Sequence, residues 1–126
     1  MGTRSTIAIY EGEQHLVTIY QQYDGYPSSA GLVLARFIKS GKFVNGLGGE
    51  KKLVFNGMGC FAAALIKELK DGPGGTCIVP KDQKEEYNYK VVGDFYKPEV
   101  TVACQGHESF KAGTPAAFMK WCEAQE

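Results

Sequence analysis

The 126-residue sequence has no long hydrophobic run and no excess of charge of either sign. Its apolar stretches are far shorter than the roughly 18 residues that a membrane-spanning helix requires, so we expect no membrane partner. The N-terminal segment lacks the apolar core of a secretory signal, which predicts a cytoplasmic protein. Lys and Arg together number 14, as do Asp and Glu. This balance disfavours a protein that coats long nucleic acids.

Metal ligands and activated nucleophiles are also scarce. The four cysteines are scattered without a Cys-x-x-Cys pair, and only His15 and His107 accompany them. This pattern predicts free thiols, mostly buried, and no zinc site. No Gly-x-Ser-x-Gly elbow or Walker loop is present. Cys60, near an expected helix start, is the single candidate for an activated thiol, but a small packing residue is the favoured interpretation. The sequence therefore favours binding over catalysis, with no catalytic residue, metal or cofactor expected.

The hydrophobic pattern predicts one α+β domain over residues 1–126. Segments 4–10 and 15–23 are rich in β-branched and aromatic residues and are separated by Gly12, which predicts a β-hairpin. The charged segment 81–86 is expected to be a solvated turn. Three further strands are predicted at 76–79, 87–92 and 99–104.

Three helices are predicted from apolar spacing and capping residues. The first begins at Pro27 and ends at Gly41, the second has Asn56 as its N-cap, and the third follows Thr114. The resulting order is β-β-α-α-β-β-β-α, a mainly antiparallel sheet of about five strands with three helices packed on it. The first helix is expected to bury Ala30, Val33, Leu34, Phe37 and Ile38, and the second Met58, Phe61, Ala62, Leu65, Ile66 and Leu69.

An aromatic turn is the first candidate ligand site. Tyr20, Tyr23 and Tyr26 surround Asp24-Gly25, where a strand gives way to a helix. Tyrosines offer flat surfaces and a hydroxyl that suit a base or a sugar. The alternative is a purely structural turn, in which Asp24 caps the helix and the tyrosines complete the core.

The start of the second helix is the other candidate. Asn56, Gly57 and Gly59 precede or open that helix, where free backbone N–H groups favour an anion. The alternative is that the glycines only permit close approach of the helix end. Arg4 and Ser5, at the start of the first strand, complete the predicted ligand-binding set. Arg4 could clamp a phosphate if the fold brings it beside Asp24 or Asn56.

The opening Met-Gly-Thr-Arg-Ser, the block Tyr23-Asp24-Gly25-Tyr26-Pro27 and the closing Gly-Thr-Pro…Phe…Trp pattern resemble a largely uncharacterised family of short phage and bacterial proteins. Many members of that family carry His-Trp before Asp-Gly-Tyr-Pro, where this chain has Gln22-Tyr23. A role of that histidine therefore cannot be transferred. The resemblance implies a phage setting, in which small accessory proteins often counter host defence by sequestering nucleotide signals.

These observations lead to a hypothesis of a non-enzymatic binder of a small anionic, nucleotide-like ligand in the host bacterial cytoplasm. Two alternatives stay open, namely a protein–protein inhibitor of a host enzyme and a small nucleotide hydrolase or transferase. Zero net charge and 44% hydrophobic residues in a short chain also predict a homo-oligomer, formed through an apolar patch.

Overall fold

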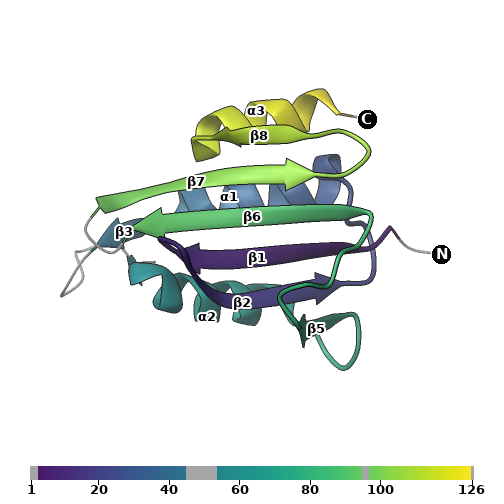
Figure 1. Cartoon of the computed structure of the whole chain (residues 1–126), viewed down its shortest axis with the longest axis horizontal. Helices are drawn as coiled ribbons and strands as arrows, with labels where there is room; N and C mark the ends of the chain where they lie inside the picture. The colour runs from purple at the N-terminus through teal and green to yellow at the C-terminus, as the bar shows by residue number, and fades with distance from the viewer. Residues whose placement is uncertain (1–2, 45–53, 95–96, 126) are drawn as a thin grey trace.

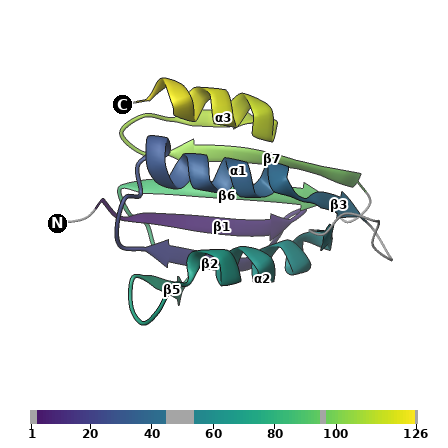
Figure 2. The same ribbon diagram turned by 180° about the vertical axis from the view of Figure 1, so that it is seen from behind.

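The fold is a β-sheet with helices packed against one face, as Figures 1 and 2 show from opposite sides. The computed structural model describes residues 3–44, 54–94 and 97–125. Within these residues six strands form one sheet in the order β5-β2-β1-β6-β7-β8, in which only β1 and β6 pair in parallel. The α+β class is confirmed. The strands are β1 (Ser5–Glu11), β2 (Gln14–Gln21), β5 (Thr76–Val79), β6 (Tyr87–Asp94), β7 (Lys97–Gln105) and β8 (Phe110–Gly113).

The predicted N-terminal hairpin is confirmed. β1 and β2 pair antiparallel on either side of a turn at Gly12, whose φ of 60° is a conformation that glycine adopts without strain. Ile7, Ile9 and Ile19 are buried on the same face of the hairpin. This face is the one that the helices cover.

The predicted strand number and order need correction. β8 adds a sixth strand to the main sheet, and β3 (Lys42–Val44) and β4 (Val54–Asn56) form a separate parallel pair. Each of these strands has only three or four residues. β8 lacks the β-branched residues that mark the equally short β5, and the pairing of β3 with β4 depends on neighbours supplied by the tertiary structure.

Three α-helices lie within the described residues: α1 (Leu32–Ser40), α2 (Gly57–Leu69) and α3 (Pro115–Ala124). A π-helical turn, Pro27–Gly31, precedes α1. The Thr114 hydroxyl accepts a hydrogen bond from the Ala117 N–H at 3.1 Å, which confirms the predicted cap of α3. Asn56 takes the cap position of α2, but its side chain makes no capping bond. None of the described helices is long and apolar enough to cross a membrane.

The buried face of α1 differs from the prediction. Val33 is 41% exposed, whereas Leu34, Ala35 and Ile38 are buried. A Cβ atom at Gly31 would lie 2.7 Å from the Cys122 Sγ atom, so small residues occupy the inner side where the chain approaches α3. Apolar spacing favours large side chains and overlooks a face built partly from glycine and alanine.

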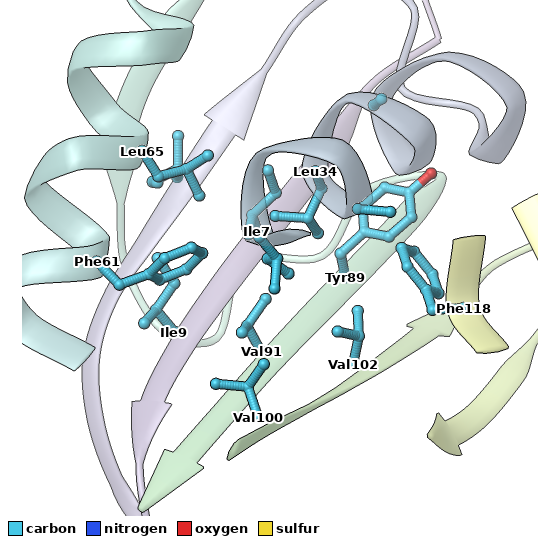
Figure 3. Packing of buried hydrophobic residues seen from close by; sticks show 14 of the residues in the cluster. Ile7, Ile9, Leu34, Phe61, Leu65, Tyr89, Val91, Val100, Val102 and Phe118 are labelled. Carbon is cyan, nitrogen blue, oxygen red and sulfur yellow. The ribbon is translucent and has the colours of Figure 1, made fainter. Parts of the chain in front are cut away.

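The core lies between the helices and the sheet (Figure 3). Phe61 of α2 meets Phe55 edge-to-face at 5.1 Å between ring centroids. Phe118 of α3 meets Tyr89 of β6 in the same manner at 6.1 Å. The predicted stripe of α2 is confirmed, since Met58, Phe61, Ala62 and Leu65 are buried and Ile66 and Leu69 pack beside them.

All four cysteines are free thiols, as predicted, but only two of them are buried. Cys104 of β7 and Cys122 of α3 lie in the core, whereas Cys60 and Cys77 are exposed. Burial raises the pKa of the Cys104 and Cys122 thiols to about 12. These two thiols are therefore core residues rather than nucleophiles.

Candidate functional site: a lysine cleft on the open face

The sheet face opposite the helices, here called the open face, is polar. Along β1, Ser5, Ile7 and Ile9 point toward the helices, so the alternate residues Thr6, Ala8 and Tyr10 belong to the open face. The neighbouring strands continue the pattern. Figure 1 views the sheet from this side. Helices α1, α2 and α3 leave this face uncovered, and its exposed side chains can meet a ligand, although Thr6 and Thr18 on the same face are buried.

A cleft of about 430 Å³ is hollowed into the open face. One row of residues crosses its floor, because Ala8 pairs with Thr18 on one side and with Lys90 on the other, and Lys90 pairs with Ala103. The two alanines flank Lys90 and have the smallest side chains in the row. This alternation of small residues with a long cation creates the depression and places the Lys90 side chain within it.

One wall of the cleft is the segment between β5 and β6, which Figure 1 shows passing in front of β2 and β1. Asn88 holds this segment to the sheet. Its side-chain oxygen accepts from the Glu85 N–H at 3.0 Å and from the Thr6 hydroxyl at 2.7 Å. Its side-chain NH₂ donates to the Glu85 carbonyl at 2.8 Å. The wall is therefore anchored by hydrogen bonds across β1 and β6.

Four lysines line the cleft: Lys81 and Lys84 of this wall, Lys90 of β6 and Lys111 of β8. No Asp or Glu is among the described residues that line it. None of the four forms a salt bridge within the described part of the chain. In a protein with no net charge, this is a local concentration of positive charge that can attract an anion.

Three acidic residues lie on the same wall, of which Asp82 is exposed and Glu85 and Glu86 contact other groups. The Glu85 carboxylate accepts a hydrogen bond from the Gln83 side chain at 3.0 Å. Glu86 accepts from the Arg4 backbone N–H at 3.3 Å and lies 3.8 Å from His107. The segment thus contributes Lys81 and Lys84 to the cleft lining, whereas its carboxylates are outside that lining, with Glu85 next to it through Gln83.

Tyr10 supports Lys90 from the side. The Lys90 Nζ atom lies 4.6 Å from the centroid of the Tyr10 ring, within the range of a cation–π interaction. His15 packs edge-on against the same ring, with 5.3 Å between centroids. The His15 Nε2 atom is also 2.6 Å from the Thr18 hydroxyl. These contacts give the floor of the cleft a defined arrangement.

The predicted aromatic turn lies at the N-terminal end of β1. The Gly25 N–H donates to the Thr3 carbonyl at 2.8 Å, and the Gly25 carbonyl accepts from the Tyr89 hydroxyl at 2.6 Å. Ser5 is 0% exposed, and its hydroxyl has no hydrogen-bond partner. Gly25 lies over Ser5, so that hydroxyl is covered by the turn and does not face a ligand.

The side chains of the turn lie largely at the surface. Tyr23 is 61% exposed, Tyr26 is 37% exposed, and Asp24 is exposed with a φ of 56°. Arg4 is exposed nearby, one residue before β1. Tyr20 is half-buried and pairs with Thr6, which places it on the open face beside the cleft but not in its lining.

The predicted helix-start site lies at the other end of β1. A Cβ atom at Gly57 would be 3.7 Å from the Glu11 carboxylate, whereas Gly25 contacts Ser5. Ser5 and Glu11 are the two ends of a seven-residue strand, which spans about 20 Å. Asn56, Gly57 and Gly59 therefore do not share one site with Arg4 and the aromatic turn.

Sequence reasoning missed the lysine cleft. A faint signal exists in β6, where buried Tyr87, Tyr89 and Val91 alternate with Asn88, Lys90 and Val92. The pairing of β1 with β6, which lines up Ala8 with Lys90, has no local signature. In comparisons with family models, curated proteins and solved structures, the chain matches none. The cleft is thus assigned from its own geometry.

Proposed function

We propose that this protein binds a small anionic, nucleotide-like ligand in the lysine cleft, without chemical turnover. The observation that carries the proposal is the set of Lys81, Lys84, Lys90 and Lys111 around one cleft whose described lining holds no carboxylate. The volume of about 430 Å³ lies within the range of about 300–1,000 Å³ that is usual for small-molecule sites.

The energetics favour an anion for two reasons. Ammonium groups gathered without counter-charges repel one another, and a bound anion relieves that repulsion. Each ammonium–phosphate hydrogen bond then contributes roughly 1.5–3 kcal/mol, because charge-assisted bonds are stronger than neutral ones. Lys90 and Lys111 project from β-strands, which fix their backbone positions, and the Lys90 ammonium group also contacts the Tyr10 ring.

The biological setting is also a proposal. The MGTRS and Tyr-Asp-Gly-Tyr-Pro motifs support a phage protein in a bacterial cytoplasm that sequesters a nucleotide signal of the host. In that setting tight binding without turnover is sufficient for function. A homo-oligomer remains part of this proposal, and light scattering over a wide concentration range tests it.

Calorimetric titration with cyclic dinucleotides, ADP-ribose and ADP tests the binding proposal. At least one of them should bind with micromolar or tighter affinity. Ala103→Leu should abolish that binding without loss of melting temperature, because leucine fills the floor of the cleft. Lys67→Ala, on an exposed position of α2, is the matched control and should bind as the parent does. The proposal fails if no anion in the panel binds.

The alternative of a protein–protein inhibitor has one specific observation in its favour, the exposure of Tyr23 and Tyr26 on a turn fixed to β1. Exposed tyrosines are common anchors in protein interfaces. A Tyr23→Ser/Tyr26→Ser variant separates the two functions. It should keep ligand affinity if the cleft is the site, and it should lose capture of a host protein if the turn is the site.

A further inference from the structure

We infer that the lysine cleft recognises the phosphate groups of its ligand rather than a base, and that it takes at least two such groups. This inference rests on the proposed function and specifies the ligand class for the same site. It predicts a preference for diphosphates and polyphosphates over monophosphates, whichever base they carry. Three features of the cleft support it, namely its charge, the placement of the lysines and the chemistry of the remaining lining.

The charge of the cleft exceeds what one phosphate can neutralise. The lining contains four lysines and no described carboxylate. A phosphate monoester carries about −1.5 to −2 charges at pH 7. One such group would therefore leave about half of the positive charge without a counter-charge. Two phosphate groups match the four ammonium groups more closely.

The lysines come from both sides of the cleft. Lys90 stands on β6 and Lys111 on β8, with β7 and its Ala103 between them. Two strand spacings separate their backbones by about 9–10 Å. Lys81 and Lys84 come instead from the segment anchored over β1 by Asn88. The positive charge thus extends across the cleft, which suits an extended polyanion better than a single phosphate.

The remaining described lining offers little to a base. The Tyr10 ring already has the Lys90 ammonium over it, and Tyr89 is only 1% exposed. Phe110 packs against Phe118 and Trp121, with 5.7 and 5.5 Å between ring centroids. Aromatic faces are the usual stacking platforms for bases, and no freely presented one lines this cleft within the described residues.

The neutral polar groups point to the same conclusion. The Asn88 side chain makes three hydrogen bonds to Thr6 and Glu85, so its amide is already in use. Gln105 and Ser109 line the cleft and are exposed, and they can bind sugar hydroxyls or phosphate oxygens. Gln83 also lines the cleft, with its NH₂ donating to Glu85. These few amide and hydroxyl groups are a weak basis for discriminating one base from another. Base identity should therefore have little effect on affinity.

Titration calorimetry with a matched ligand series at constant salt tests the inference. The series contains adenosine, AMP, ADP and ATP, the corresponding uridine compounds, and inorganic tripolyphosphate. Affinity should rise about tenfold with each added phosphate, as expected for one further charge-assisted contact. Exchange of the base should change it less than about threefold, and tripolyphosphate should bind about as tightly as ATP.

Each other outcome overturns a different statement. Affinity that follows the base and ignores phosphate number would overturn the inference while leaving the proposed binding function intact. A series in which nothing binds would overturn both. A ten-nucleotide single strand that binds more tightly than ATP or UTP would also overturn the inference, because the open face would then serve a nucleic acid chain.

Variants distinguish recognition of phosphate from support of the fold. Lys90→Gln and Lys111→Gln keep a long polar side chain but remove the charge. Each should weaken ATP about tenfold and AMP by less than about threefold, so that the preference for ATP shrinks. Lys67→Gln on α2 should change neither affinity. An equal loss of affinity for ATP and AMP would show that these lysines do not set the preference for additional phosphate groups. A fall in melting temperature that accompanies the loss of affinity would show that they support the fold instead.

Discussion

The two faces of the six-stranded sheet are built from alternate residues of the same strands, yet they serve different purposes. The covered face of β6 presents Tyr89 and Val91 to the helices. Asn88 and Lys90, which alternate with them along the strand, line the cleft on the open face. The covered face has almost no water contact, so its side chains are constrained by volume and shape. The side chains of the open face are constrained instead by their charge and by the space that the small residues Ala8 and Ala103 leave beside Lys90.

This comparison shows how one strand can carry stability and function at once. Changes on the covered face alter the free energy of unfolding, because they create cavities or strain in a close-packed region. Changes on the open face should alter ligand affinity and leave stability almost unchanged. The following predictions test that division, from the largest expected effect to the smallest.

The largest expected effect is a fall in the free energy of unfolding at alkaline pH, caused by the two buried thiols of the covered face. Burial holds the pKa of the Cys104 and Cys122 thiols at about 12, against an ordinary value of about 8.5 in an unfolded chain. The stability from keeping them protonated is complete below about pH 8.5 and is lost as the pH rises toward 12. Each thiol can contribute a slope of up to about 1.4 kcal/mol per pH unit.

Urea unfolding at several pH values between 7 and 11 measures this slope. Cys122→Ala should make the slope shallower, whatever its effect on stability at pH 7, because one of the two titrating thiols is gone. A free energy of unfolding that stays constant from pH 8 to pH 10.5 would contradict the burial of these thiols.

Truncation of the core should have the next largest effect. Phe61→Ala removes a ring that contacts Phe55 and Phe37, with 5.1 and 5.9 Å between ring centroids. Loss of a buried phenylalanine typically costs about 3–5 kcal/mol of unfolding free energy. Thr101→Ala on the exposed side of β7 is the open-face control, and it should stay within about 0.5 kcal/mol of the parent. Urea unfolding followed by circular dichroism measures both. Similar losses in the two variants would contradict the division between the faces.

A pair of neighbouring substitutions in the aromatic turn should give the smallest effects. A Cβ atom at Gly25 would lie 2.6 Å from the Ser5 Cβ atom and 2.9 Å from the Thr3 carbonyl, so Gly25→Ala should cost about 1–3 kcal/mol. Asp24→Asn should cost less than about 1 kcal/mol, because asparagine tolerates the φ of 56° at that position.

Thermal unfolding compares these two variants directly, and ATP titration adds a second measurement. Neither substitution touches the described cleft lining, so both folded variants should bind ATP as the parent does. If Asp24→Asn lost ligand affinity at unchanged stability, the aromatic turn rather than the lysine cleft would be the site.

Much of the scaffold could be predicted because its signals are local. The hairpin of β1 and β2 follows from two alternating segments around Gly12, and α3 begins where Thr114 and Pro115 predict. Prediction fell short where the signal is not local. β8 contains no β-branched residue, and the π-helical turn before α1 approaches α3 through Gly31, which carries no hydrophobic signal.

The sequence by itself determined the α+β class, the hairpin, the stripe of α2 and the balance of charge, because side-chain alternation, capping and composition act over a few neighbouring residues. Only the tertiary structure decided that four lysines gather around one cleft. Thr6 and Asn88 are hydrogen-bonded although 82 positions separate them, and Ala8 pairs with Lys90 in the same ladder. Strand pairing at such separation depends on how the whole chain buries its apolar faces. The lysine cleft is a consequence of that burial and has no counterpart in any single segment.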